Sequence, residues 1–399
     1  MNDLFSSIGQ LAWPLSLVLS WMAGELLYRW TGLPRISVYG IAGFLFGNLA
    51  SGVVAASDSA SFLLLANLGF GLILFELGYR INLRWLRANP WILITALCES
   101  LLTFAALYAV GRYFGMPAIA AGLLGALGMA SSPAGLLRVL NEQRAAGQVT
   151  ERVLHLAALN CVLAVFLFNA IIGFKVFQAS GQLGHAATVS LLVLGASALL
   201  GGLFGMLVPL WLRSMGRGST DSASDATLPY ALAVLLLVAV THVLTLSPVL
   251  AALAFGLVAR YRRSALGVAQ RNFGALGDLL SVLLFVFAAS TLAWDQVAAG
   301  LALGVLLVIV RLVVKVGVCA AFARVSGISV RKGALSGLAL APMGVFAILL
   351  IEQARRLGVD LFESLAPLAA IALLLQLIGP FLSQRAVMAA AETHHAREA

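Results

Sequence analysis

Three ionisable residues stand inside apolar runs, where a charged side chain is costly. Arg311 and Lys315 lie near the middle of the run 297–323, and Glu99 lies well inside the run 91–111. A spacing of four residues places Arg311 and Lys315 on one face of a helix. An ionisable group at membrane depth marks an ion or proton path, or the counter-ion of one. We therefore predict that Arg311 and Lys315 face a protein-lined or water-filled cavity and that Glu99 is the deep carboxylate of the chain.

A polar residue and a thiol, Asn160 and Cys161, occupy the centre of the apolar run 152–175. Hard cations such as Na⁺ and K⁺ prefer oxygen ligands, so a thiol is a poor ligand for them. A neighbouring cation such as Lys315 would favour the thiolate, whereas burial opposes it. A small core residue with no chemical role is an equally acceptable interpretation of Cys161.

Proline and glycine interrupt two apolar runs, in MASSPAGLL (129–137) and LALAPMGVF (338–346). Proline removes a backbone donor, and the backbone groups that a break leaves free must find partners inside a membrane. Paired interruptions in the two halves of a chain are typical of inverted-repeat secondary transporters, whose half-helices face the substrate. The break residues are Ser131, Ser132, Pro133, Pro342 and Gly344.

Membrane-spanning helices must position these residues. Hydrophobic residues make up 61% of the 399 and charged residues only 10%, whereas a soluble chain is nearer half apolar and a quarter charged. A span needs about 20 apolar residues, and we predict an all-α polytopic membrane protein with about 13 spans. The predicted segments are 9–28, 37–55, 61–79, 91–111, 117–140, 152–175, 186–212, 228–244, 247–260, 273–293, 297–323, 333–354 and 364–384. The eighth and ninth are short, and one broken span is the alternative for that stretch.

Most arginines fall in alternate loops, which predicts an outside N-terminus and a cytoplasmic C-terminus. The same residues account for the net charge of +9, so we expect lipid and not nucleic acid as the large partner. The three cysteines lie far apart inside apolar runs, without the spacing of a metal site. The sequence also has no nucleotide loop and no hydrolase triad. We expect no enzyme activity, no cofactor and no metal.

We expect one integral membrane transporter domain over 1–399, with no soluble regulatory domain. The Gly/Ser/Asp-rich stretch 213–227 is predicted to be a flexible cytoplasmic linker between the two halves. Residues 386–399 are predicted to form a short cytoplasmic tail.

The order and spacing of four stretches resemble the monovalent cation:proton antiporters, in the branch of sodium/proton and potassium-efflux exchangers. The stretches are LFELGYRINLRWLR (74–87), the first break with the following helix (129–168), LTLSPVLAALAFGLVARYRR (244–263), and the basic helix with the second break (310–350). Together they run along nearly the whole chain.

The resemblance implies a scaffold bundle that forms homodimers and a mobile transport core, in the inner membrane of a bacterial-type cell. It implies that a cation and protons compete for a core carboxylate during alternating access. Asn160 matches the asparagine of the family's Asn-Asp pair, Lys315 matches the basic residue of the opposite helix, and both breaks match. Two departures stand out: Cys161 replaces the aspartate, and Val345 replaces a glutamate common after the second break.

Three functional hypotheses follow from these departures. In the first, which we prefer, the chain exchanges Na⁺ or K⁺ for protons, with the role of the aspartate moved to Glu99 or to a Cys161 thiolate beside Lys315. In the second, Arg311, Lys315 and the positive ends of half-helices favour an anion as the transported ion. In the third, the chain does not transport and serves as a sensor or partner subunit.

Overall fold

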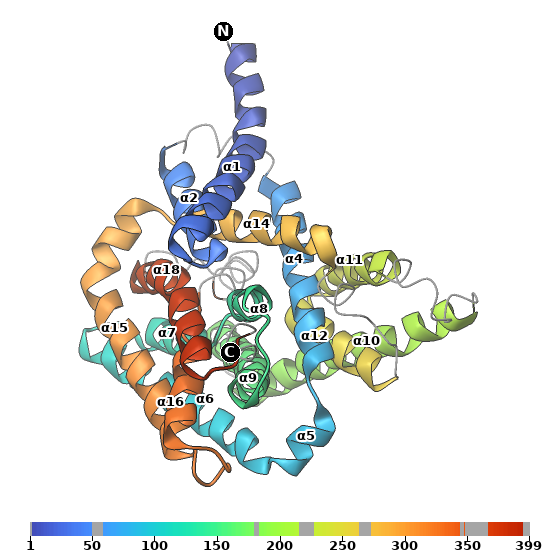
Figure 1. The fold of residues 1–399 in the computed structure, drawn as a ribbon, viewed down its shortest axis with the longest axis vertical. Coiled ribbons are helices and arrows are strands. Elements are labelled where there is room, and N and C mark those ends of the chain that lie inside the picture. The colour runs from blue at the N-terminus through green and yellow to red at the C-terminus, as the bar shows by residue number, and fades with distance from the viewer. Residues whose placement is uncertain are drawn as a thin grey trace.

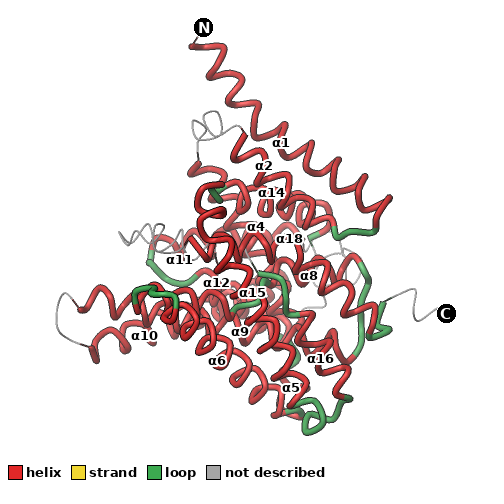
Figure 2. The backbone as a smooth tube through the Cα atoms, turned by 90° about the vertical axis from the view of Figure 1, so that its left-hand side faces the viewer, coloured by secondary structure: helices red, strands yellow, loops and turns green. Residues whose placement is uncertain are grey.

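The computed structural model describes residues 2–49, 59–178, 183–214, 227–262, 273–343, 347 and 366–393. These residues form helices and no strand, which confirms the all-α prediction (Figure 1; Figure 2). The helices are α1 (Asn2–Thr31), α2 (Arg35–Leu49), α4 (Ser59–Arg80), α5 (Leu83–Ala88), α6 (Pro90–Tyr113), α7 (Ala118–Met129), α8 (Pro133–Glu142), α9 (Gln148–Gln178), α10 (Leu183–Ser214), α11 (Thr227–Val243), α12 (Pro248–Tyr261), α14 (Gly274–Ser290), α15 (Trp294–Ala321), α16 (Val330–Ala339) and α18 (Ala366–Ala389).

Each predicted span contains at least part of a described helix. Six helical stretches among the described residues are long and apolar enough to cross a bilayer, and the protein is a multi-pass membrane protein. The run predicted as either two short spans or one broken span forms two helices, α11 and α12, joined by a turn with Thr245 at a φ of 54°. The short helix α5 was not predicted. Its six residues are too few to span a membrane.

The first predicted break separates α7 from α8. Ala130 and Ser132 have extended backbone, and Pro133 begins α8, where a missing N–H costs no hydrogen bond. The Ser132 hydroxyl caps α8 by accepting a hydrogen bond from the Gly135 N–H at 3.3 Å. The second break begins where α16 ends at Ala339, and the chain is irregular through 340–343.

Some predicted features fall on residues outside the described part of the chain. They are Gly344, Val345 and most of the predicted linker, residues 215–226. The predicted tail is described as far as 393. Its first residues, 386–389, extend α18, and Glu392 is buried.

The helices pack as two groups: in Figure 1 the first lies along the top and the right, and the second lies at the left and the centre. One group contains α1, α2, α4, α10, α11, α12 and α14, and the other contains α6, α7, α8, α9, α15, α16 and α18. The broken helix lies deepest: 94% of the most apolar window of Ala118–Glu142 is buried, compared with 17% for Leu191–Leu212 of α10. The first break and residues 340–343 of the second are therefore enclosed by protein, as a functional interruption requires.

Small residues allow close helix contacts within the first group. A Cβ atom added at Gly78 of α4 would lie 2.1 Å from the Leu253 carbonyl oxygen of α12. A Cβ atom added at Gly256 of α12 would lie 2.0 Å from the Phe75 carbonyl oxygen of α4. Only glycine permits this approach, which is typical of membrane helix packing.

Most other acidic residues of the helices pair near helix ends. Glu25 pairs with Arg29 at 3.0 Å, and Glu76 pairs with Arg80 at 2.7 Å, and both pairs lie four residues apart on one helix. Asp278 is largely exposed and contacts Arg138. These contacts near helix ends are structural, whereas Glu99 is fully buried within α6 of the second helix group.

Candidate functional site

The centre of the site is an ion pair between α6 and α15. The Lys315 ammonium contacts Glu99 Oε1, and neither side chain has any exposed surface. Lys315 also donates to the Met129 carbonyl at the end of α7, at 2.9 Å. The Thr103 hydroxyl donates to the same Glu99 oxygen at 3.3 Å. The sequence placed both charges at membrane depth, and the structure brings them together.

Arg311, one turn before Lys315, ties the two breaks together. Its guanidinium donates to the carbonyl oxygens of Gly128 at 2.7 Å and Ala130 at 2.9 Å, both at the end of α7. It also donates to those of Leu340 at 3.2 Å and Ala341 at 2.8 Å, just beyond α16. Carbonyls at helix C-termini carry partial negative charge. One buried cation thus compensates the ends of both half-helices.

The two breaks also contact each other directly. The Ser131 hydroxyl donates to the Leu340 carbonyl at 2.9 Å, and the Ser132 N–H donates to the Pro342 carbonyl at 2.7 Å. Pro133 begins α8 beside this contact, and all three residues of the first break are buried. Each break therefore supplies hydrogen-bond partners to the backbone of the other, in addition to those that Arg311 supplies.

Asn160 and Cys161 are fully buried on α9, beside the place where the two breaks contact each other, which we call the crossing of the breaks. Asn160 Oδ1 accepts a hydrogen bond from the Ser100 hydroxyl of α6 at 2.7 Å. Cys161 Sγ lies 3.5 Å from the Ser131 carbonyl oxygen, which it approaches as a donor. The polar partner of the thiol is therefore a backbone oxygen, not Lys315.

Two buried polar atoms in this cluster have no hydrogen-bond partner: Glu99 Oε2 and Asn160 Nδ2. They belong to neighbouring helices, because Glu99 adjoins Ser100, which contacts Asn160. An unpaired carboxylate oxygen in a dry site is costly, and it becomes satisfied when it takes a proton or a cation. The arrangement can therefore bind one positive charge at the carboxylate.

Sequence reasoning missed two residues of this cluster, Ser100 and Thr103. The signal was available, because CESLLT (98–103) places polar residues at helical spacing around Glu99 inside an apolar run. The carbonyl oxygens bound by Arg311 and Lys315 gave no signal, since every residue has one. Among the described residues, no group of three or more His, Cys, Asp or Glu could hold a metal ion.

The sequence and the fold both match known exchangers. The family model for sodium/hydrogen exchangers, transmembrane region, matches residues 15–386. No curated protein matches the sequence. Two structures of the sodium proton antiporter MjNhaP1 from Methanocaldococcus jannaschii are similar in fold. One, at pH 8, has 16% identity over 96% of this chain and 95% of the other, with a TM-score of 0.65. The other, from an electron-microscopy map, has 17% identity over 97% and 95%, with a TM-score of 0.69.

The match to the family model covers nearly the whole chain and includes α6, α9, α15 and both breaks. It confirms the resemblance drawn from the four sequence stretches and the expectation of a secondary transporter. The chain belongs to the sodium/hydrogen exchanger family, and it is a membrane antiporter of cations and protons.

Proposed function

We propose that Glu99 is the carboxylate for which the cation and the proton compete, in place of the aspartate that Cys161 replaces, and that Lys315 is its counter-ion. The observation that carries this proposal is the fully buried contact between Glu99 and Lys315, next to the crossing of the breaks. A buried charge pair without function would be an expensive feature of a membrane protein.

Exchange follows from the limited capacity of one carboxylate. A proton on Glu99, or Na⁺ or K⁺ beside it, neutralises the carboxylate in turn, and the two cannot do so together. Asn160 supplies a further oxygen ligand. A half-turn of its amide keeps the contact with Ser100, since a hydroxyl both donates and accepts, and turns Oδ1 toward a cation. Alternating access then exposes the loaded site to each side of the membrane.

The thiolate alternative receives less support from the contacts. Cys161 faces a carbonyl oxygen, which would repel a thiolate, and the described contacts of the Lys315 ammonium go to Glu99 and Met129. The anion alternative needs donors that are free to bind an anion. Arg311 already donates to four carbonyl oxygens, and Lys315 is already paired with Glu99, so their described contacts do not favour an anion.

The remaining features belong to the same proposal. The protein is a homodimer in the inner membrane of a bacterial-type cell, with its N-terminus outside and its C-terminus in the cytoplasm. The distribution of arginines supports this orientation. Broad exposed apolar surfaces on α1 and α10 support burial in lipid; Trp21 is 53% exposed and Leu199 72%. Residues 1–399 act as one transporter domain, with 213–227 joining its halves and 386–399 ending it in the cytoplasm.

The test is exchange in proteoliposomes. A pH gradient is imposed, Na⁺, K⁺ or Li⁺ is added, and internal pH is followed for the wild type and for Glu99→Gln. We expect the wild type to dissipate the gradient with at least one cation. The rate of dissipation by Glu99→Gln should be lower by more than about 100-fold, since an amide neither binds a proton nor carries charge.

The matched control is Asp278→Asn, which makes the same chemical change at an exposed acid and should keep wild-type exchange. Exchange that persists in Glu99→Gln would overturn the assignment of Glu99. A wild type that moves none of the three cations, together with a Cys161→Asp variant that does, would show a scaffold whose site needs the aspartate.

A further inference from the structure

α8 leads from the first break to Glu142 and carries charged contacts between the two helix groups. Arg138 Nε donates to the Ser281 hydroxyl of α14 at 2.7 Å, and Arg138 Nη1 contacts Asp278. Glu142, four residues later, pairs with Arg35 of α2 at 3.5 Å between Oε1 and Nη1. Both charged residues of this half-helix of the second group therefore bind the first group.

Asn141, which precedes Glu142, contacts the end of α4. Its amide nitrogen donates to Glu76 Oε1 at 3.1 Å, and its Oδ1 accepts a hydrogen bond from Arg80. Asn141 and Glu142 follow Arg138 by three and four residues, so the three side chains lie on one face of α8. This face contacts α2, α4 and α14 of the first group. We call the contacts of Arg138, Asn141 and Glu142 with these helices the α8 latch.

The α8 latch is partly shielded from solvent. The side chains of Arg138 and Glu142 are only 17% and 13% exposed. Partly buried charges are screened by salt much less than exposed ones, so these contacts hold the two groups together. Asp278 is 71% exposed and contributes little. Arg138 is therefore held mainly by the Ser281 hydroxyl and the Gly277 carbonyl.

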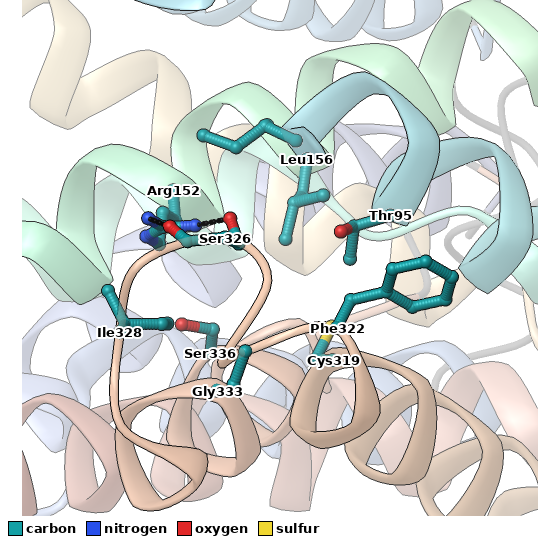
Figure 3. Close-up of a pocket in the computed structure, with 11 residues that line it drawn as sticks. Thr95, Arg152, Leu156, Cys319, Phe322, Ser326, Ile328, Gly333 and Ser336 are labelled. Carbon is teal, nitrogen blue, oxygen red and sulfur yellow. Dashed lines mark hydrogen bonds between the residues drawn. The ribbon is translucent and has the colours of Figure 1, made fainter. Parts of the chain in front are cut away.

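Other polar contacts at the same end of the molecule tie the second group to itself. Figure 3 shows Arg152 of α9 beside Ser326, in the connection between α15 and α16, where Arg152 Nη2 donates to the Ser326 carbonyl at 2.5 Å. Glu392, just beyond α18, accepts hydrogen bonds from the first turn of α9. A movement of the second group against the first would keep these contacts and break those of the α8 latch.

Each first-group arginine of the latch has a second partner within its own group. Arg35 Nε donates to Glu25 Oε2 at 2.8 Å, which is shorter than the contact of Arg35 with Glu142. Arg80 pairs with Glu76 at 2.7 Å. Departure of α8 would therefore leave both arginines paired, and it would avoid the cost of a partly buried charge without a counter-ion.

The two charged residues of α8 are also placed to pair with each other. Arg138 and Glu142 are four residues apart, which is the spacing of an ion pair along a helix, and they lie within electrostatic range of each other. In the described conformation both contact partners in the first group instead. Their mutual pair becomes available when α8 leaves those partners.

We propose that the α8 latch closes the arginine-rich end of the transport path and opens by an exchange of partners. When the latch is closed, Arg138 binds Ser281 and Glu142 binds Arg35. When it is open, Arg138 pairs with Glu142, and Arg35 keeps Glu25. Because the charges have partners in both states, the two conformations can lie close in free energy, as alternating access requires. The proposal uses the alternating access of the proposed function and does not depend on which carboxylate binds the ion.

The test measures the open population directly. Nitroxide labels are attached to the full-length protein at Tyr261→Cys of α12 and Ala146→Cys after α8, two exposed positions on opposite sides of the latch. The three native cysteines are replaced by alanine, and double electron–electron resonance in lipid nanodiscs gives the distribution of distances between the labels. Opening of the latch adds a population at longer distance.

Two substitutions should favour the open state. Ser281→Ala removes the side-chain acceptor of Arg138, and Arg35→Gln removes the partner of Glu142. Each should raise the ratio of open to closed protein about three- to fivefold, as for the loss of one partly shielded contact. Glu142→Gln added to Ser281→Ala should lower that ratio again, because Arg138 then has no carboxylate partner in the open state.

The sign of the Glu142→Gln effect distinguishes an exchange of partners from an ordinary ion pair. If Glu142 served only to bind Arg35 in the closed state, Glu142→Gln would open the latch further, and this result would overturn the proposal. The matched control is Arg29→Gln, because Arg29 pairs with the same Glu25 as Arg35 does but is 71% exposed. It should keep the wild-type distribution of distances.

Exchange in proteoliposomes gives a second readout that needs no labels. A larger open population should lower the KM for a cation offered at the arginine-rich end and raise the KM at the opposite side. Arg35→Gln should show this asymmetry, and equal changes on both sides would contradict the latch. The distance shifts should persist in Glu99→Gln. A failure of the Glu99 assignment is therefore seen as exchange that survives in Glu99→Gln, and a failure of the latch is seen in the distances.

Discussion

Glu99 and Lys315 are 216 residues apart in the sequence, yet they form an ion pair from which both side chains have lost all contact with solvent. The pair joins α6 to α15 and lies against the end of α7 through the Met129 carbonyl. Removal of either charge leaves the other buried and unpaired in a site with few alternative partners. Both the stability of the protein and its transport activity should therefore depend on the pair.

Lys315→Gln alone should lower stability by about 3–5 kcal/mol, because the Glu99 carboxylate remains buried without its counter-ion. The double variant Glu99→Gln/Lys315→Gln should lose less than the two single variants together, since no charge is left unpaired. Thermal unfolding in detergent, with all four proteins compared, gives the coupling. Strictly additive losses would show that the two groups do not interact in solution.

Cys161→Ala should retain exchange within about threefold of the wild type, because the thiol makes one weak contact and carries no charge in the proposed mechanism. Cys161→Asp should lower the KM for the cation, since a carboxylate adds a hard oxygen ligand beside the crossing. Initial rates of exchange across a cation series measure both effects. Loss of cation:proton exchange in Cys161→Ala would contradict this expectation and would support a Cys161 thiolate as the charged group that binds the cation or the proton.

Arg311→Met should destabilise the protein by about 3–5 kcal/mol, because the buried carbonyls of Gly128, Ala130, Leu340 and Ala341 all lose the guanidinium as a donor. Arg311→Lys should also be unstable, since an ammonium cannot reproduce the planar fork of a guanidinium. The midpoint of thermal unfolding checks both, with Arg324→Met as an exposed control. Wild-type stability in Arg311→Lys would mean that charge alone matters at this position.

Glu392, which lies within the predicted tail just beyond α18, should hold the first turn of α9. Its carboxylate accepts hydrogen bonds from the N–H groups of Val149 and Thr150, each at 2.8 Å. Glu392→Ala should cost about 1–2 kcal/mol, as for loss of a charged helix cap. Hydrogen–deuterium exchange at the start of α9 should then rise.

The exposed Glu151, in the same turn, provides the control, because Glu151→Ala removes a carboxylate that caps neither N–H. Gly147→Ala should resemble Glu392→Ala, since its Cβ atom would lie 2.2 Å from Glu392 Cδ. Hydrogen–deuterium exchange at the start of α9 that is the same in Glu392→Ala and the wild type would show that the cap does not limit opening of the helix.

The sequence predicted the elements of the site better than their partners. Apolar length and helix-breaking residues located the spans and the break at Pro133, because both signals are local. Depth alone singled out Glu99, Arg311 and Lys315. The pattern did not decide whether Lys315 meets Glu99 or Cys161, since that choice depends on how α6, α9 and α15 pack. The targets of Arg311 were beyond prediction, because backbone carbonyls do not differ between residues.

The single guanidinium that holds the ends of α7 and α16 has a mechanical consequence. Because Arg311 of α15 is hydrogen-bonded to both broken segments, sliding of one segment past the other would break these four hydrogen bonds in a dry interior. The two breaks and the adjoining part of α15 therefore form one rigid unit. The conformational change that carries the site from one side of the membrane to the other must move this unit as a rigid body, with the hinges in the connections outside it.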